Sequence, residues 1–397
     1  MTRFVVCLDG TWNNAAKETE RADGSRVYRP TNVLKVARAT RRTADDGRPQ
    51  VTYYDAGVGA MNRAPSGAAR VLRKVDNVLG GALGAGFEVN IEEAYTFLAN
   101  NWTQGDELFV FGFSRGAAQA RSLCELIRAI GGFPAKRDAY YVPTLFGDHL
   151  ASFGRGSGAE RWEALNARRR ESGRSLLAPL VPARIRFLGV WDTVLALGSR
   201  FKKRGEATEA AVAFHAPASP PANVDRVRHA IAIDERRHDF QPEIFDPAQG
   251  AHDDLEQRWF AGVHSNVGGG LVEDGLANCA LHWMVEEAKA VGLDLDDDFL
   301  KFYRRFAAGR ASTKSLGFRA MDTVFRPLRG FAGERDLTRV PGMTLDPSVI
   351  TRLHAEASEF DSMDARYRPA NLLRYLKAHP ELHDQLKDDV RAAALAA

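Results

Sequence analysis

The chain has 397 residues, of which 45% are hydrophobic and 26% are charged, and its formal net charge is +3. These values are ordinary for a globular protein with a sizeable buried core, and so small a net charge gives no reason to expect a nucleic-acid partner. No apolar run approaches the roughly 18 residues of a membrane-spanning helix. The chain begins with a strand-like segment instead of a signal peptide. We therefore expect a protein that is made in the cytoplasm and whose export, if any, does not use a cleaved signal.

Apolar runs and turn-rich clusters predict alternating strands and helices along most of the chain. Strands are predicted at residues 3–8, 51–56, 108–111, 185–190 and 258–263, and helices at residues 32–38, 88–100, 117–130 and 276–291. Residues 224–234 fit both a helix and a strand, and the pattern leaves both open. The Gly- and Ala-rich residues 60–87 predict a flexible flap. This alternation is typical of an α/β fold with a mostly parallel sheet flanked by helices.

Two further segments lack clear strand patterns. Residues 138–183 carry many charges and glycines, which predicts an inserted helical cap or lid. Residues 291–397 read as a mostly helical region packed on the preceding domain, and they end in an amphipathic pattern over residues 369–397. We therefore expect a catalytic α/β domain at residues 1–290 followed by a helical C-terminal region.

The segment 107–121 reads ELFVFGFSRGAAQAR, which is the G-x-S-x-G pattern with an apolar strand before it and an Ala-rich helix after it. In this context Ser114 is predicted to be a nucleophile on a tight strand-to-helix turn. Side chains two positions away would collide in such a turn, so Gly112 and Gly116 are expected to be required there. The alternative is an ordinary strand–Gly–helix turn with an incidental serine.

Three predicted strands end in a Ser, an Asp and a His, in the chain order Ser114, Asp192, His264. This order is the one found in α/β-hydrolases, and catalytic groups of such sheets gather at the carboxyl ends of the strands. A serine hydroxyl needs an imidazole to take its proton, and the imidazole needs an acceptor to orient it. Asp234 is the alternative acid, unless it forms a salt bridge with a neighbouring arginine.

An acyl-transfer site also needs two donors for the developing oxyanion. The N–H of Arg115, directly after the nucleophile, is the first expected donor. The loop at Gly10 and Thr11, which follows the first predicted strand, is the best placed source of the second.

Metal ions and disulfides have little support in the sequence. The chain has three scattered cysteines in apolar surroundings, Cys7, Cys124 and Cys279, which predicts buried free thiols in a reducing compartment. There is no H-E-x-x-H and no paired cysteine motif, and the acidic residues 293–298 lack the Gly and closing Glu of a calcium loop. We expect no metal, and no cofactor, because water alone hydrolyses an acyl-enzyme.

The segments LDGTWN, GDELFVFGFSRGA, FLGVWDT and GVHSNVGGG occur in this order between Arg3 and about Trp283. In this combination the chain resembles a group of α/β-hydrolases long catalogued as a domain of unknown function, which includes the catalytic domain of type VI secretion phospholipase effectors. The resemblance implies that Ser114 is the nucleophile of a Ser-Asp-His triad with Asp192 and His264. It also implies an acyl ester of a glycerophospholipid as substrate, transient contact with a membrane surface, and an immunity or delivery protein as partner.

Two departures from the family pattern limit what carries over. The family's histidine segment usually reads HSDVGGG, and Asn266 stands here where that Asp would be, so any role of that carboxylate is lost. The effectors are also often longer, so the hydrolase chemistry carries over better than the antibacterial role. The sequence therefore predicts a serine ester hydrolase, with a small-ester esterase and a catalytically silent binding or regulatory protein as the alternatives.

Overall fold

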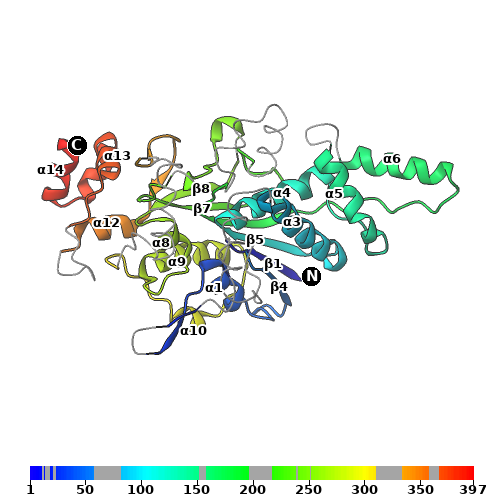
Figure 1. The fold of residues 1–397 in the computed structure, drawn as a ribbon, viewed down its shortest axis with the longest axis horizontal. Helices are drawn as coiled ribbons and strands as arrows, with labels where there is room; N and C mark the ends of the chain where they lie inside the picture. The colour runs from blue at the N-terminus through cyan, green and yellow to red at the C-terminus, as the bar shows by residue number, and fades with distance from the viewer. Residues whose placement is uncertain are drawn as a thin grey trace.

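Seven parallel strands form the central sheet of the chain, in the order β4-β1-β5-β6-β7-β8-β9. The computed structural model describes residues 1–10, 13, 18–20, 24–57, 82–151, 158–195, 217–237, 240–250, 252–309, 333–356 and 366–397. The strands are β1 (Arg3–Leu8), β4 (Gln50–Asp55), β5 (Glu107–Phe113), β6 (Ile185–Trp191), β7 (Val227–Ala232), β8 (Leu255–Phe260) and β9 (Thr344–Leu345). The sheet confirms the predicted α/β class (Figure 1).

Both faces of this sheet are buried, which is why its strands read as continuous apolar runs. In β1, alternate side chains enter the two hydrophobic clusters on opposite faces. Helices α3 (Ala82–Asn101) and α4 (Arg115–Ile130) cover one face, and α1 (Asn32–Ala39) and α9 (Gly275–Ala290) cover the other. The result is the three-layer arrangement expected when strands and helices alternate.

The predicted element boundaries hold closely in the first 290 residues, with three exceptions. Strand β8 runs over Leu255–Phe260, so it begins and ends before the predicted range 258–263. Residues 227–232, which the pattern left open, form strand β7. Helix α3 begins at Ala82, so the end of the predicted flap at 60–87 is helical, while residues 58–81 lie outside the described part of the chain.

The described part of the segment 138–183 contains helical elements, as its composition predicts. Its elements are η1 (Lys136–Tyr141), α5 (Val142–Ala151) and α6 (Gly158–Glu171). A Cβ on Gly158 would lie 2.1 Å from the Cα of Ile130, the last residue of α4. Because α4 has 16 residues and starts directly after Ser114, α6 meets it about 24 Å from that serine. The start of α6 is therefore far from Ser114, and the lid role of this segment stays a prediction.

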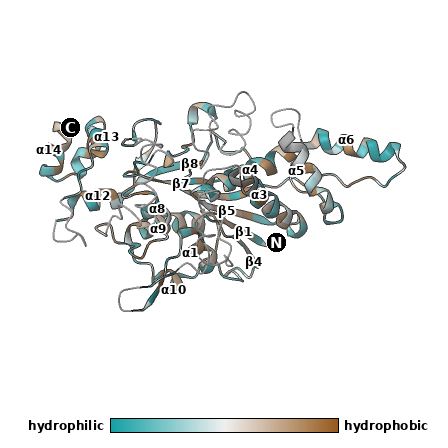
Figure 2. Cartoon of the chain, viewed as in Figure 1, coloured by the Kyte–Doolittle hydropathy of each residue, from teal (hydrophilic) through white to brown (hydrophobic). Residues whose placement is uncertain are grey.

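Helix α6 also has the surface of a solvated element. Its buried residues are Gly158, Trp162 and Asn166, and Figure 2 draws most of the helix as hydrophilic. Figure 1 places α5 and α6 at one end of the molecule and the C-terminal helices at the other. The arginine-rich end of α6 is consistent with stabilisation of a helix C-terminus by positive charge.

The C-terminal region adds to the sheet and also packs on it. It supplies the edge strand β9 and the helices α12 (Pro347–His354), α13 (Ala370–Ala378) and α14 (Asp388–Ala396). Their apolar side chains form one cluster with Ile231, Ile233 and Trp259 from the β7 and β8 part of the sheet. The single helix pattern predicted over residues 369–397 is broken by the 3₁₀ helix η6 (Pro380–Gln385), because Pro380 cannot continue an α-helix.

The remaining described elements are short. They are β2 (Glu18–Glu20), β3 (Arg26–Tyr28), η4 (Pro247–Gln249), α8 (His264–Gly268) and α10 (Asp297–Leu300). Helix α8 follows β8 directly and begins at His264, so it brings that side chain to the carboxyl edge of the sheet.

We predict that Gly116→Ala destabilises the protein by about 1–3 kcal/mol or more, because a Cβ there would overpack the contact between α4 and β1. That Cβ would lie 2.2 Å from the carbonyl oxygen of Leu8. Urea unfolding followed by circular dichroism measures the change. Gly147→Ala in α5 is the matched control, since its added Cβ meets no described atom within 4 Å beyond its chain neighbours and its own helix backbone. Alanine is also favoured over glycine in helices by about 0.5–1 kcal/mol. Equal stability of the two variants would contradict the close packing.

Candidate active site

Ser114 stands on a strained turn between β5 and α4. Its backbone has φ 60° and ψ −124°, a conformation that non-glycine residues rarely adopt. A Cβ on Gly112 would lie 2.4 Å from the carbonyl oxygen of Gly116, which leaves no space for a side chain. The two glycines therefore allow the turn, as the G-x-S-x-G pattern predicts.

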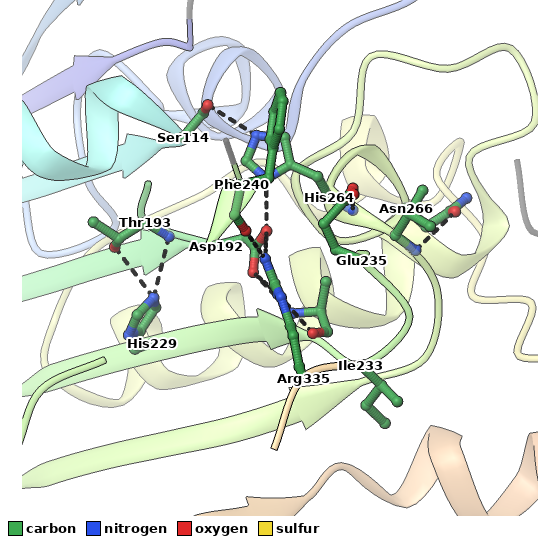
Figure 3. Close-up of polar contacts among 12 residues, drawn as sticks. Ser114, Asp192, Thr193, His229, Ile233, Glu235, Phe240, His264, Asn266 and Arg335 are labelled. Atoms are coloured by element: carbon green, nitrogen blue, oxygen red, sulfur yellow. Dashed lines mark hydrogen bonds and ion pairs between the residues drawn. The ribbon is translucent and has the colours of Figure 1, made fainter. Parts of the chain in front are cut away.

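Ser114, His264 and Asp192 form one hydrogen-bonded relay (Figure 3). His264 Nε2 lies 2.8 Å from Ser114 Oγ, and His264 Nδ1 lies 2.6 Å from Asp192 Oδ2. All three side chains are buried. Asp192 leaves the end of β6 with φ 38°, so this residue is also held in an unusual backbone conformation. The structure thus brings together the three residues that the strand ends predicted.

The imidazole of His264 is held between two aromatic rings and a buried carboxylate. The ring of Phe113 lies 4.6 Å away between centroids, and that of Phe240 lies 4.8 Å away in an edge-on arrangement. The His264 backbone N–H donates to Glu235 Oε2 at 3.3 Å. Glu235 is in turn paired with Arg237 at 2.7 Å. The two rings thus pack against the imidazole, and Glu235 binds the backbone of the residue that carries it.

Asp192 makes a second ion pair that the sequence analysis missed. Arg335 Nη1 lies 2.6 Å from Asp192 Oδ1, and Arg335 Nη2 lies 3.1 Å from Oδ2. Burial alone would raise the pKa of Asp192, but Arg335 and His264 outweigh it and hold the pKa well below its usual range. Asp192 is therefore ionised at neutral pH although its side chain is completely buried. No motif surrounds Arg335, so no local signal identified it.

A neutral histidine lies behind the acid. His229 in β7 is fully buried, and its Nε2 lies 3.1 Å from Thr193 Oγ1 and 3.3 Å from the Thr193 backbone nitrogen. Its Nδ1 lies 3.2 Å from Gln257 Oε1. Burial, followed by the nearby charge of Arg121, lowers the pKa of His229 to about 3. His229 thus supports the loop after Asp192 from a position within strand β7.

The alternative acid, Asp234, points elsewhere. Its carboxylate accepts the Gly262 backbone N–H at 2.6 Å and the Tyr367 hydroxyl at 2.9 Å. It therefore ties the loop before α8 to the C-terminal region. The described hydrogen bonds of the His264 imidazole go to Asp192 and Ser114, and Asp234 is not among its described partners.

The expected oxyanion donors are only partly described. Arg115 is the first residue of α4, so its backbone N–H lies directly after the nucleophile. A Cβ on Gly10 would lie 3.0 Å from Ser114 Cβ, so the loop after β1 passes beside the nucleophile. The Gly10 N–H, however, donates to Asp9 Oδ1 at 2.7 Å, so it is already engaged. Thr11 lies outside the described residues.

Asn266 has a structural position in the loop that carries His264. Its Oδ1 accepts the backbone N–H of Val263 at 3.2 Å, and its own N–H donates to the Val263 carbonyl at 2.7 Å. The side chain is 1% exposed. Asn266 thus closes the first turn of α8. The contact to Val263 needs an acceptor oxygen, which an amide supplies as well as a carboxylate.

Other potential sites in the described part of the chain do not coincide with this relay. Among the described residues, no three or more His, Cys, Asp or Glu side chains gather as metal ligands would. A cavity bordered by Glu107, Arg184 and Arg186 lies near the amino-terminal ends of β5 and β6, whereas Ser114 follows the carboxyl end of β5. No helix in the described ranges is long and apolar enough to cross a membrane. The three cysteines are buried and unpaired, as predicted.

The parallel sheet and the Ser, Asp and His at its carboxyl edge place the chain in the α/β-hydrolase-like class. A family model described as "T6SS, Phospholipase effector Tle1-like, catalytic domain" matches residues 2–287, and the chain belongs to this family.

Individual relatives are distant. Uncharacterized protein YEL023C of Saccharomyces cerevisiae is 24% identical over 255 residues, which are 62% of this chain and 33% of the relative. The crystal structure of an uncharacterized protein from Pseudomonas aeruginosa covers 99% of this chain and 59% of that chain, with 17% identity and a TM-score of 0.41. The structure of the Tle1 effector bound to the VgrG spike from the Type 6 secretion system covers 68% of this chain and 51% of that chain, with 18% identity and a TM-score of 0.33. The chain thus spans a third of the yeast protein and little more than half of each solved chain.

We predict that His229 makes the protein less stable in acid. Its pKa in the folded protein is about 3, below the ordinary value of 6.5, so the unfolded chain binds the proton first as the pH falls. Between these two values the free energy of unfolding should drop by about 1.4 kcal/mol per pH unit on account of this group. Urea titrations at pH 7.5, 6.0 and 5.0 measure the slope, which His229→Gln should flatten. The same substitution at the partly exposed His383 of η6 serves as control, and an unchanged slope in His229→Gln would refute the assignment.

Proposed function

We propose that the chain is a serine ester hydrolase that cleaves an acyl ester of a phospholipid through an acyl-enzyme intermediate. The observation that supports this most directly is the continuous relay of 2.8 Å and 2.6 Å hydrogen bonds from Ser114 through His264 to Asp192. Its order and geometry are those of a Ser-His-Asp triad. Membership of a family described as phospholipase effectors supports the substrate class.

In the proposed reaction, Ser114 Oγ attacks the ester carbonyl carbon while its proton moves to His264 Nε2. Asp192 accepts a hydrogen bond from the Nδ1–H of His264. This bond keeps the proton on Nδ1, leaves Nε2 unprotonated and stabilises the imidazolium that forms. The helix start at Arg115 directs N–H groups towards the tetrahedral oxyanion. His264 then protonates the leaving alcohol, and a water molecule, deprotonated by the same imidazole, hydrolyses the acyl-enzyme. The overall reaction consumes only the ester and one water molecule.

The second oxyanion donor remains part of the proposal. The loop after β1 is the best placed source, since Gly10 lies against Ser114. Because the Gly10 N–H is engaged by Asp9, we assign the donor to the next peptide, the N–H of Thr11. The expected partner, an immunity or delivery protein, and transient contact with a membrane surface rest on family membership alone.

We predict that a fluorophosphonate probe labels the wild-type protein and not Ser114→Ala. Removing the nucleophile should also lower the rate of phospholipid hydrolysis by about six orders of magnitude, because the triad acts as a unit. Ser122→Ala, on the same helix and fully buried, is the matched control and should keep both labelling and activity. Hydrolysis is followed on phosphatidylethanolamine, phosphatidylglycerol and short p-nitrophenyl esters.

Each alternative function has its own result in this experiment. A folded wild type that is not labelled would be a silent binding or regulatory protein. A wild type that is labelled and hydrolyses only the short esters would be a small-ester esterase. Both outcomes would overturn the phospholipase proposal.

We predict that Asp192→Asn lowers kcat by about 10⁴-fold, because the histidine loses the acceptor that selects its tautomer. Asp234→Asn should cost stability through the lost contacts to Gly262 and Tyr367, while kcat falls less than about tenfold. Steady-state kinetics on a soluble ester, with circular dichroism to check folding, separates the two. If Asp234→Asn lowers kcat more than Asp192→Asn does, the catalytic acid has been assigned to the wrong residue.

A further inference from the structure

We propose that Arg335 is a positioning residue of the active site, which fixes the carboxylate of Asp192 and balances its charge. The C-terminal region would then supply part of the machinery of the catalytic domain. This inference rests on the proposed triad, but it concerns a residue beyond the segment 2–287 that the family model matches.

The guanidinium of Arg335 makes four hydrogen bonds, all of them buried or nearly so. Two go to the carboxylate oxygens of Asp192, at 2.6 Å and 3.1 Å. The other two go to the carbonyl oxygens of Ala232 at 2.6 Å and Phe240 at 2.5 Å. The side chain is 1% exposed, and that of Asp192 is fully buried. A planar guanidinium suits this arrangement, because it can bind both carboxylate oxygens and two carbonyls at once.

These contacts leave the Asp192 carboxylate in a single orientation. Oδ1 accepts from Arg335 and from the backbone N–H of Ala232 at 3.0 Å. Oδ2 accepts from Arg335 and from His264 Nδ1. Rotation of the carboxylate would break contacts at both oxygens, so Oδ2 stays aimed at the imidazole. Figure 3 shows Arg335 on the side of Asp192 away from Ser114, where it cannot touch a substrate at the nucleophile.

The charge of Arg335 also affects the imidazole. Two carboxylates face His264, Asp192 at its Nδ1 and Glu235 at its backbone N–H. Glu235 is offset by Arg237, and Asp192 is offset by Arg335. The two aromatic neighbours of the ring carry no charge. Without Arg335, Asp192 would attract a proton to His264 more strongly, and the base would be protonated at a higher pH.

The neighbours behind Asp192 do not compensate for this loss. His229 has a pKa lowered to about 3, so it is neutral at working pH. Arg121, the next buried cation, binds the backbone carbonyls of Glu243 and Pro217 and does not contact Asp192 in the described hydrogen bonds. Arg335 is therefore the cation that the described contacts join to Asp192 directly.

The C-terminal region holds Arg335 in place through its backbone. Asn371 of α13 donates from Nδ2 to the carbonyl oxygens of both Arg335 and Ile233, each at 3.1 Å. The preceding residue, Glu334, pairs with Arg236 at 2.9 Å and with Arg374 at 2.8 Å. Arg335 is thus clamped between the loop after β7 and helix α13. These contacts hold the backbone from which the Arg335 side chain reaches Asp192.

The decisive experiment is a histidine NMR titration of wild type and Arg335→Met, with His264 assigned by His264→Gln. We expect the titration midpoint of His264 to rise in Arg335→Met, because a positive charge next to the Asp192–His264 pair is removed. In a soluble-ester assay, the acid limb of kcat/KM should move to higher pH by the same amount. At the pH optimum, kcat should fall about 10²-fold with KM nearly unchanged, because the acid is no longer held in place.

Two further variants separate positioning from simple support of the fold. Arg335→Lys keeps the charge but cannot bind both oxygens, so its midpoint should match wild type while kcat falls. Arg352→Met removes another buried arginine of the C-terminal region, whose guanidinium binds the Ala307 and Gly309 carbonyls. It should lower stability and leave both the midpoint and the pH profile unchanged.

The results that would reject the role of Arg335 differ from those that would reject the proposed hydrolase activity. An unmoved His264 midpoint in Arg335→Met, an equal shift in Arg352→Met, or wild-type kcat in Arg335→Lys would each overturn the role of Arg335. If Arg335→Met does not fold, the Arg335→Lys result decides. A wild type that hydrolyses no ester would instead contradict the proposed function, while the NMR titration would still decide whether Arg335 controls His264.

Discussion

Helix α4 lies against the backbone of strand β1 so closely that Gly116 has no room for a Cβ, and this contact determines where Ser114 stands. Strands β1 and β5 are paired with Leu8 opposite Gly112, and the chain must turn into α4 directly above that pair. The positive φ of Ser114 follows from this turn. Since Phe113 pairs with Trp191, Ser114 and Asp192 leave the sheet at the same level. The register of the sheet thus places the nucleophile and the acid side by side.

The second constraint is the charge of a fully buried carboxylate. Asp192 can be ionised in this position only because the guanidinium of Arg335, the imidazole of His264 and a backbone N–H bind it. One of these groups, Arg335, comes from a region outside the segment that defines the family. Deleting the C-terminal region would therefore expose apolar surface on β7 and β8 and also leave the acid without its cation. Residues on both sides of the predicted domain boundary at residue 290 therefore contribute to the active site.

The sequence predicted Ser114, Asp192 and His264 because each follows an apolar run, and the carboxyl ends of parallel strands share one edge. It could not choose finally between Asp192 and Asp234, since both follow strands of the same sheet. The choice depends on which carboxylate faces His264, and Asp234 turns instead to Gly262 and Tyr367. The lid role predicted for residues 138–183 stays a prediction, because composition indicates a helix but not the surface on which that helix packs.

Local rules account for what the sequence determined by itself: the strands, the flanking helices, the glycines of the turn at Ser114 and the three residues at the strand ends. These features depend on neighbouring residues and on the repeat of apolar positions, which can be read along the chain. Only the tertiary structure decided the partner of Asp192, the place of helices α5 and α6, and the burial of His229. Arg335 lies 143 residues from Asp192, and a contact over that separation exists only once β7, β8 and α13 have packed together.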